Sequence, residues 1–153
     1  MDYTVVDVRP EMLDGVEAIE RQCFSLPWTK KQLEGQLKNS QHEFLAAVSE
    51  DGTVLGYVGM TYVLDEGYIS NVAVAEPFRR LGIGDRLIDT LLSRAEGLAL
   101  AFVSLEVRES NTPAKELYAK HGFVPVGLRK NYYEKPRENA LLMTKFLKEM
   151  NVN

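Results

Sequence analysis

The chain has 153 residues, of which 45% are hydrophobic and 26% charged, and its formal net charge is −4. This length predicts one domain covering residues 1–153, and the acidic balance argues against a nucleic-acid binder, whose surface is basic. Cys23 is the only cysteine, which excludes an internal disulfide and a cysteine-based metal cluster. No apolar run approaches the roughly 20 residues of a membrane span and the N-terminus lacks the pattern of an export signal, so we expect a cytoplasmic protein.

Apolar periodicity divides the chain into alternating predicted strands and helices. In chain order we expect a strand at 2–9, helices at 11–23 and 30–37, strands at 42–50, 53–65 and 68–75, a helix at 84–96, a strand at 101–109, a helix at 112–121, and strands at 123–133 and 139–147. The order β-α-α-β-β-β-α-β-α-β-β predicts an α+β fold. Its mixed central sheet of about seven strands would carry helices on both faces.

Several residues between these elements carry turn or cap signals. Thr29 and Gln32 have the spacing of a capping box at the start of the second helix. Thr112 is expected to cap the fourth helix, and Gly122 to close it. We expect Glu66-Gly67 to form the turn before the strand at 68–75.

The segment Arg79-Arg80-Leu81-Gly82-Ile83-Gly84 joins a predicted strand to a predicted helix. Glycine lets the backbone turn tightly and approach a ligand, and the first N–H groups of a helix have no partner within it. Together these features suit an anion such as a diphosphate, to which Arg79 and Arg80 could add contacts. The alternative is a glycine-softened helix start with two solvated arginines. A Walker phosphate loop is excluded because Asp85-Arg86 follows the second glycine instead of Lys-Ser/Thr.

Further motifs extend this pattern along the chain. The sequence has "CFSLPWT" at 23–29, "NVAVAEPFRRLGIG" at 71–84, "LEVRESN" at 105–111, "AKELYAKHGF" at 114–123 and "RKNYY" at 129–133. With these motifs the chain resembles the GNAT acetyltransferase family over nearly its whole length. Within that family it is similar to the bacterial ribosomal-protein alanine N-acetyltransferases.

The resemblance implies acetyl-CoA as co-substrate and no metal. It places the diphosphate on the segment from Arg79 to Gly84 and the pantetheine arm along the backbone of Val72-Ala73-Val74. Asn111 matches a position near that arm, although it could equally be a turn residue before the fourth helix.

The resemblance also assigns the proton-transfer roles. Glu106 matches the proton acceptor, and its alternative is an arginine-paired carboxylate on an exposed strand face. Tyr118 matches the general acid, and its alternative is packing in the core. Trp28, Tyr132 and Tyr133 would border the acceptor. Their alternatives are a hydrophobic staple for Trp28 and cross-strand packing for the two tyrosines.

The predicted function is therefore transfer of an acetyl group to the N-terminal amine of a protein, most specifically the alanine of a small-subunit ribosomal protein. We expect a monomer with a peptide N-terminus as partner, and neither nucleic acid nor membrane. Asn139 stands where many close relatives carry an acidic residue, so acceptor preference is less defined. Two alternatives stay open. The acceptor could be another amine, or the chain could be a non-catalytic acyl-CoA-binding module, which would not need Glu106 and Tyr118.

Overall fold

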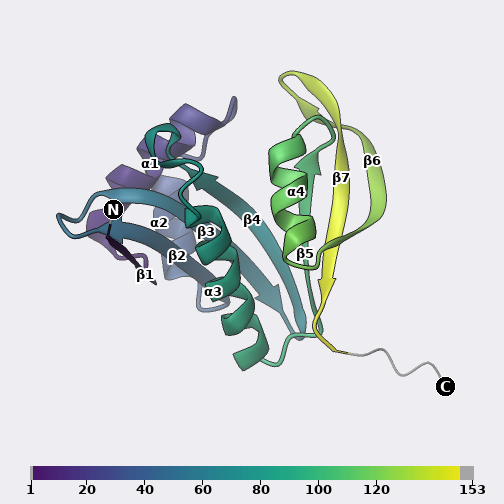
Figure 1. The fold of residues 1–153 in the computed structure, drawn as a ribbon, viewed down its shortest axis with the longest axis horizontal. Helices are drawn as coiled ribbons and strands as arrows, with labels where there is room; N and C mark the ends of the chain where they lie inside the picture. The colour runs from purple at the N-terminus through teal and green to yellow at the C-terminus, as the bar shows by residue number, and fades with distance from the viewer. Residues whose placement is uncertain (1, 149–153) are drawn as a thin grey trace.

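A computed structural model describes residues 2–148 and contains one seven-stranded sheet with the strand order β1-β2-β3-β4-β5-β7-β6 (Figure 1). The strands are β1 Tyr3–Asp7, β2 His42–Ser49, β3 Val54–Val63, β4 Glu66–Val74, β5 Phe102–Arg108, β6 Val124–Glu134 and β7 Arg137–Phe146. The helices are α1 Leu13–Cys23, α2 Lys30–Lys38, α3 Ile83–Gly97 and α4 Thr112–Lys120, with short 3-10 turns η1 Pro10–Met12 and η2 Glu76–Phe78. The predicted α+β fold and its element order are confirmed. No helix among the described residues is long and apolar enough to cross a membrane.

The helices cover the sheet unequally (Figure 1). On one side α3 packs its apolar stripe, including Leu87 and Leu91, over the middle strands, and Tyr118 of α4 joins the same cluster. On the other side α1 and α2 pack over Phe44 and Tyr57 of β2 and β3. We call these the α3–α4 face and the α1–α2 face. The two faces alternate along each strand because successive side chains point to opposite sides.

Strands β4 and β5 form a V. They pair in parallel only over Glu66–Tyr68 and Phe102–Ser104, and beyond these residues they separate (Figure 1). β4 also carries an irregularity at Ser70, where its register with β3 shifts between Gly59 and Met60. A bulge of this kind bends the strand locally, which directs β4 away from β5. The sheet therefore opens at its centre, while the strands within each half remain paired with their neighbours.

The predicted turn at Glu66-Gly67 is wrong. The chain turns two residues earlier, at Leu64-Asp65, with Leu64 at a left-handed φ of 56°. Glu66 and Gly67 already pair with β3 and β5. A Cβ at Gly67 would lie 2.9 Å from the Met60 sulfur. This glycine is therefore required by close packing inside the sheet, which sequence alone cannot distinguish from a turn.

Of the three predicted caps, two are confirmed and one is wrong. Gly122 follows the C-cap His121 of α4 at a left-handed φ of 89°, as expected of a closing glycine. The capping box of α2 is confirmed: the Gln32 N–H donates to Thr29 Oγ1 at 3.2 Å, and the Thr29 N–H donates to Gln32 Oε1 at 2.9 Å. Thr112, however, is not the cap of α4. Asn111 occupies that position, and its Oδ1 accepts from the Ala114 N–H at 3.2 Å. Both residue types are good caps, so local composition could not separate them.

Candidate active site

The opening of the sheet contains a cleft of about 500 Å³. Its walls come from α1, the α1–α2 loop, β4, β5, α4 and β6. Seven of the residues singled out in the sequence line it: Trp28, Val72, Glu106, Asn111, Tyr118, Tyr132 and Tyr133. Residues separated by more than 100 positions in the chain thus meet in one hollow, which is the arrangement expected of a binding or catalytic site.

The β4 edge of the cleft exposes main-chain hydrogen-bonding groups. The Ala75 N–H donates to the Leu55 oxygen, so Ala75 and Ala73 are the residues that bond to β3. By alternation, Val72 and Val74 direct their N–H and C=O groups toward the opening. The Val74 oxygen accepts from Arg79 Nε at 3.0 Å. The groups of Val72 therefore face the side that β5 has left, where an extended amide-bearing molecule could pair with them.

The glycine turn forms the start of α3, as the sequence suggested. Gly82 is the N-cap at φ 80°, a left-handed conformation that glycine adopts without strain. Gly84 allows α3 and α4 to approach, because a Cβ there would lie 3.2 Å from Leu117 Cδ2. The Arg86 N–H donates to the Gly82 oxygen. The N–H groups of the residues before Arg86 in the helix therefore have no helical acceptor and are suited to an anion.

The two arginines of the turn differ in their contacts. Arg79 donates from Nη2 to Cys23 Sγ at 3.2 Å, in addition to its bond to Val74. Its guanidinium thus ties the end of β4 to the end of α1. Arg80 is exposed at a left-handed φ of 65°, and Leu81 beside it is 55% exposed. Both arginines are exposed, but the side chain of Arg79 is held by its bonds to β4 and α1.

Glu106 lies in the middle of β5 on the α1–α2 face. Its neighbours Leu105 and Val107 are buried on the opposite face. Glu106 Oε1 lies 3.4 Å from Arg129 Nε, and the Glu106 side chain is 22% exposed. Its second oxygen is buried without a hydrogen-bond partner among the described residues. A carboxylate with one free oxygen at the floor of a cleft can accept a proton from a ligand.

Tyr118 reaches the cleft from the other side of the sheet. It lies on α4, is 5% exposed, and packs against Phe123 with ring centroids 5.8 Å apart. Burial, with a smaller contribution from Tyr133, raises the pKa of Tyr118 well above its ordinary value. The phenol therefore remains protonated at neutral pH and can donate a hydrogen bond or a proton. Glu106 and Tyr118 approach one cleft from opposite faces of β5.

Tyr132 and Tyr133 close the cleft from β6. Their rings contact edge to face at 5.1 Å, and the Arg108 guanidinium lies 4.3 Å from the centroid of Tyr133. Burial and the Glu106 carboxylate raise the pKa of Tyr133 to about 12. The contact with Glu106, followed by burial, raises the pKa of Tyr132. Both phenols are therefore neutral donors beside the carboxylate.

Trp28 and Asn139 make contacts that stabilise the structure around the cleft. Trp28 packs partly buried against the cluster that includes Leu33 of α2, so it meets the staple interpretation and also lines the cleft. Asn139 accepts from the Asn131 N–H at 2.9 Å, which holds the β6–β7 hairpin. The side chain at position 139 thus supports the part of β6 that carries Tyr132 and Tyr133.

Sequence reasoning missed Glu20, which also lines the cleft. This glutamate of α1 is completely buried, and one of its oxygens accepts a hydrogen bond from Asn71 Nδ2 on β4. Burial raises its pKa above the ordinary value of a glutamate. The signal was present, because Glu20 follows Val16 by four residues and Val16 belongs to the apolar stripe of α1.

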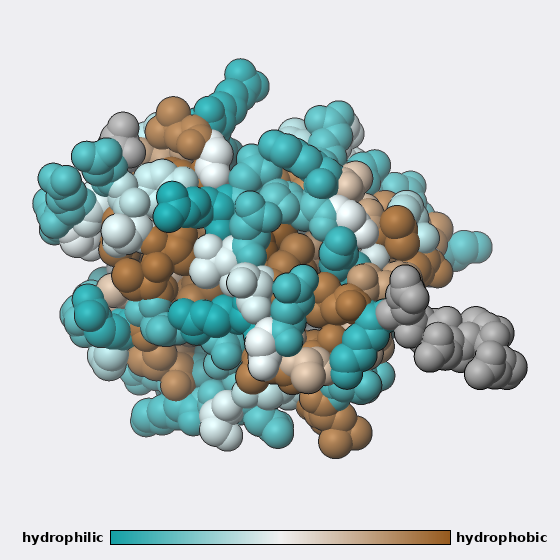
Figure 2. Space-filling view, turned by 60° about the horizontal axis from the view of Figure 1, so that its bottom comes forward, coloured by the Kyte–Doolittle hydropathy of each residue, from teal (hydrophilic) through white to brown (hydrophobic). Residues whose placement is uncertain are grey.

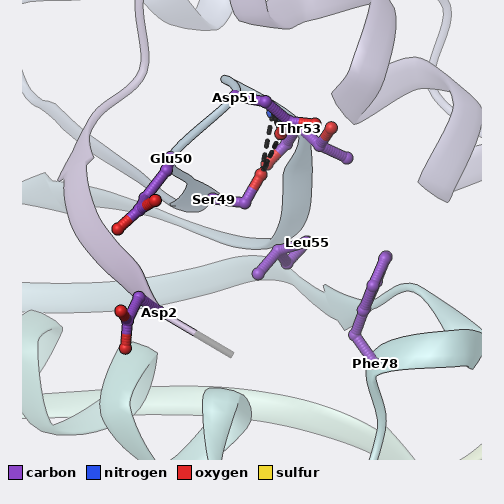
Figure 3. A pocket seen from close by; sticks show the side chains of 7 residues that line it. All are labelled: Asp2, Ser49, Glu50, Asp51, Thr53, Leu55 and Phe78. Atoms are coloured by element: carbon purple, nitrogen blue, oxygen red, sulfur yellow. Dashed lines mark hydrogen bonds between the residues drawn. The ribbon is translucent and has the colours of Figure 1, made fainter.

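A separate hollow of about 400 Å³ lies beside the β2–β3 hairpin (Figure 3). Asp2, Glu50 and Asp51 line it, and Ser49 donates a hydrogen bond to Asp51. None of the candidate site residues lines this hollow, and its three carboxylates would repel a diphosphate. Among residues 2–148 no cluster of three or more potential metal ligands is found.

The comparisons with known proteins agree with this geometry. Residues 13–123 match the family model described as "Acetyltransferase (GNAT) family", and the chain belongs to that family. Members are acetyltransferases that use acetyl-CoA as co-substrate.

Three similar proteins have names that state the acceptor of the acetyl group. A Haemophilus influenzae protein named [ribosomal protein bS18]-alanine N-acetyltransferase is 37% identical over 84% of this chain and 88% of its own. A Bacillus subtilis protein provisionally given the same name is 36% identical over 91% of this chain and 92% of its own. The crystal structure of the ribosomal-protein-S18-alanine N-acetyltransferase from Escherichia coli superposes with a TM-score of 0.89 and 27% identity, covering 99% of this chain and 98% of that one.

Proposed function

We propose that this chain acetylates the N-terminal α-amine of a protein, and that its acceptor is the alanine at the N-terminus of ribosomal protein bS18. The observation that carries the proposal is the meeting of Glu106 and Tyr118 in one cleft beside the open backbone of Val72. The names of the Haemophilus influenzae and Escherichia coli proteins support the choice of acceptor.

Binding of acetyl-CoA would use the backbone more than side chains. The N–H groups at the start of α3, released by Gly82 and Gly84, would hold the diphosphate. The main chain at Val72 and Val74, beside Ala73, would pair with the pantetheine amides. Asn111 uses its carbonyl as a helix cap, so its Nδ2 group is the donor it could offer the same arm.

The reaction requires two proton transfers. An α-amine has a pKa of roughly 7.7–8.0, so a carboxylate at neutral pH can assist its deprotonation. Glu106 would take the proton from the amine, directly or through water, as the nitrogen attacks the thioester carbonyl carbon. When the C–S bond breaks, Tyr118 would donate a proton to the leaving sulfur. The products are an amide and the free thiol of CoA.

The places of Glu106 and Tyr118 in the cleft explain how an attacking amine could contact both side chains. Glu106 projects on the α1–α2 face and Tyr118 comes from the α3–α4 face, so acceptor and co-substrate could enter the cleft from opposite sides. Trp28, Tyr132 and Tyr133 line the acceptor side, where uncharged aromatic walls would exclude water around the attacking amine.

The proposal is tested by measuring thiol release from acetyl-CoA with hexapeptides that differ only in the first residue, using the bS18 N-terminal sequence as parent. We expect the Ala-starting peptide to give the highest kcat/KM, and Ser- and Met-starting peptides to be slower. Equal rates with free amino acids would show a different acceptor. Binding of acetyl-CoA without turnover of any amine would instead favour a non-catalytic acyl-CoA module.

A further inference from the structure

One part of the sheet has no helix over it. On the α1–α2 face, α1 and α2 pack against β1 to β4, whereas no described helix packs against the same face of β5, β7 and β6. Large apolar side chains on this uncovered face are each between 46% and 50% exposed: Tyr68, Val124, Val126, Tyr132 and Phe146. Single exposed apolar residues are ordinary, but a group on one face marks a binding surface.

Four of them, Tyr68, Val126, Tyr132 and Phe146, line a groove of about 680 Å³. Tyr68 and Phe102 form one side, with ring centroids 6.1 Å apart in an edge-to-face contact. The floor contains a buried hydrogen bond of 2.6 Å between Ser104 and Thr144. Phe146 lies toward the end remote from Glu106. Figure 2 shows the molecule with the bottom of Figure 1 turned forward, and on that side brown hydrophobic residues are exposed between teal polar ones.

The groove continues directly from the proposed active site. Trp28, Glu106, Tyr132 and Tyr133 line both the groove and the cleft. A chain whose first nitrogen lies at Glu106 can therefore extend into the groove without leaving the protein surface. From Glu106 to Phe102 the strand spans four residues, or about 13 Å at roughly 3.3 Å per residue, which matches about four residues of an extended peptide.

The chemistry of the groove determines what it can recognise. β5 is paired on one side with β7 along this whole stretch and on the other side with β4 as far as Ser104. Between Phe102 and Ser104 its backbone therefore offers no free edge to which a peptide strand could be added. The charged side chains that line the groove are Glu106 and Arg129, and these two lie against each other. The remaining contacts are aromatic, aliphatic or hydroxyl groups. Recognition must therefore come from apolar side chains of the bound segment.

We propose that this groove binds residues two to five of the acceptor protein and selects apolar or aromatic side chains there over acidic ones. The inference rests on the proposed function, because it needs an acceptor whose amine lies at Glu106. It adds a second determinant of specificity, located in the sequence that follows the acetylated residue.

The test compares long and short acceptors with the same first residue. A hexapeptide with apolar residues at positions two to five should exceed its Asp-substituted counterpart in kcat/KM by about 10-fold or more. The exposed Phe146→Ser change should lower kcat/KM for the apolar hexapeptide by about 10-fold. It should leave unchanged both the turnover of a dipeptide amide, which is too short to reach position 146, and the affinity for acetyl-CoA.

Val63→Ser is the matched control, because Val63 is 51% exposed but does not line the groove. It should behave as the wild type. The inference is overturned if the hexapeptides are turned over equally, or if Phe146→Ser and Val63→Ser act alike. It is also overturned if Phe146→Ser abolishes a dimer seen in sedimentation while peptide kinetics stay the same, since a second copy would then occupy the groove. Failure of wild-type protein to acetylate any N-terminal amine would instead refute the proposed function.

Discussion

Replacing Glu106 with Gln keeps the shape of the side chain and removes its ability to take a proton. The structure limits the effect on stability. The contact with Arg129 is 3.4 Å long, and the two side chains are 22% and 57% exposed, so this ion pair contributes no more than about 1 kcal/mol. The folded protein should therefore survive the change.

The effect on the reaction should be much larger. Loss of a general base lowers kcat by about 10²–10⁴-fold, equivalent to about 3–5 kcal/mol of the activation barrier. We would follow thiol release at saturating acetyl-CoA and peptide between pH 6 and 9, measure acetyl-CoA affinity by calorimetry, and use thermal unfolding to check the fold. Affinity for acetyl-CoA should be unchanged.

Glu109→Gln is the matched control for this experiment. Glu109 follows β5 by one residue, is exposed, and does not line the cleft. It should retain wild-type kcat. A Glu106→Gln protein that keeps kcat within about threefold of the wild type across the pH range would refute the role of Glu106 as base.

Three further changes test separate parts of the account. Gly82→Ala should cost about 1–2 kcal/mol of stability and weaken acetyl-CoA binding, because position 82 has φ 80°. The control Gly97→Ala lies in a helix without positive φ and should do neither. Equal acetyl-CoA affinities of the two variants would contradict the anion site. Asn111→Ala should lower the free energy of unfolding by about 1 kcal/mol through loss of the cap to Ala114, and an unchanged urea midpoint would remove that explanation. Burial raises the folded-state pKa of Glu20, so this group stabilises the fold below its unfolded pKa near 4.5 and loses that contribution as pH rises through its folded pKa. Glu20→Gln should therefore gain stability relative to the wild type at pH 8 compared with pH 4, measured by urea unfolding, and a difference independent of pH would contradict the raised pKa.

The sequence predicted the fold well where the signal is local. The capping box of Thr29 and Gln32, the closing glycine Gly122 at φ 89°, and the periodicity of the helices depend on neighbours within a few residues. The same local reasoning failed at Gly67, because the reason for that glycine is the Met60 side chain on the adjacent strand. Only the folded sheet brings these two residues together.

At the candidate active site too, the sequence did not predict contacts between segments that are distant in the chain. The resemblance to the acetyltransferase family selected seven residues that line one cleft, including Glu106 and Tyr118. It could not show that Arg129 would lie against Glu106, or that Arg79 would turn back onto β4. These contacts join elements that are distant in the chain. It also missed Glu20, because a charged residue on a helix is usually solvated.

The central claim is that the cleft transfers an acetyl group from acetyl-CoA to an α-amine. The most direct test is to incubate the protein with acetyl-CoA and a bS18 N-terminal peptide that also contains lysine, and to locate the added acetyl group by fragment-ion mass spectrometry. The account predicts one acetyl group on the α-nitrogen of the first alanine and none on lysine. Acetylation of lysine, with the α-amine left free, would contradict it.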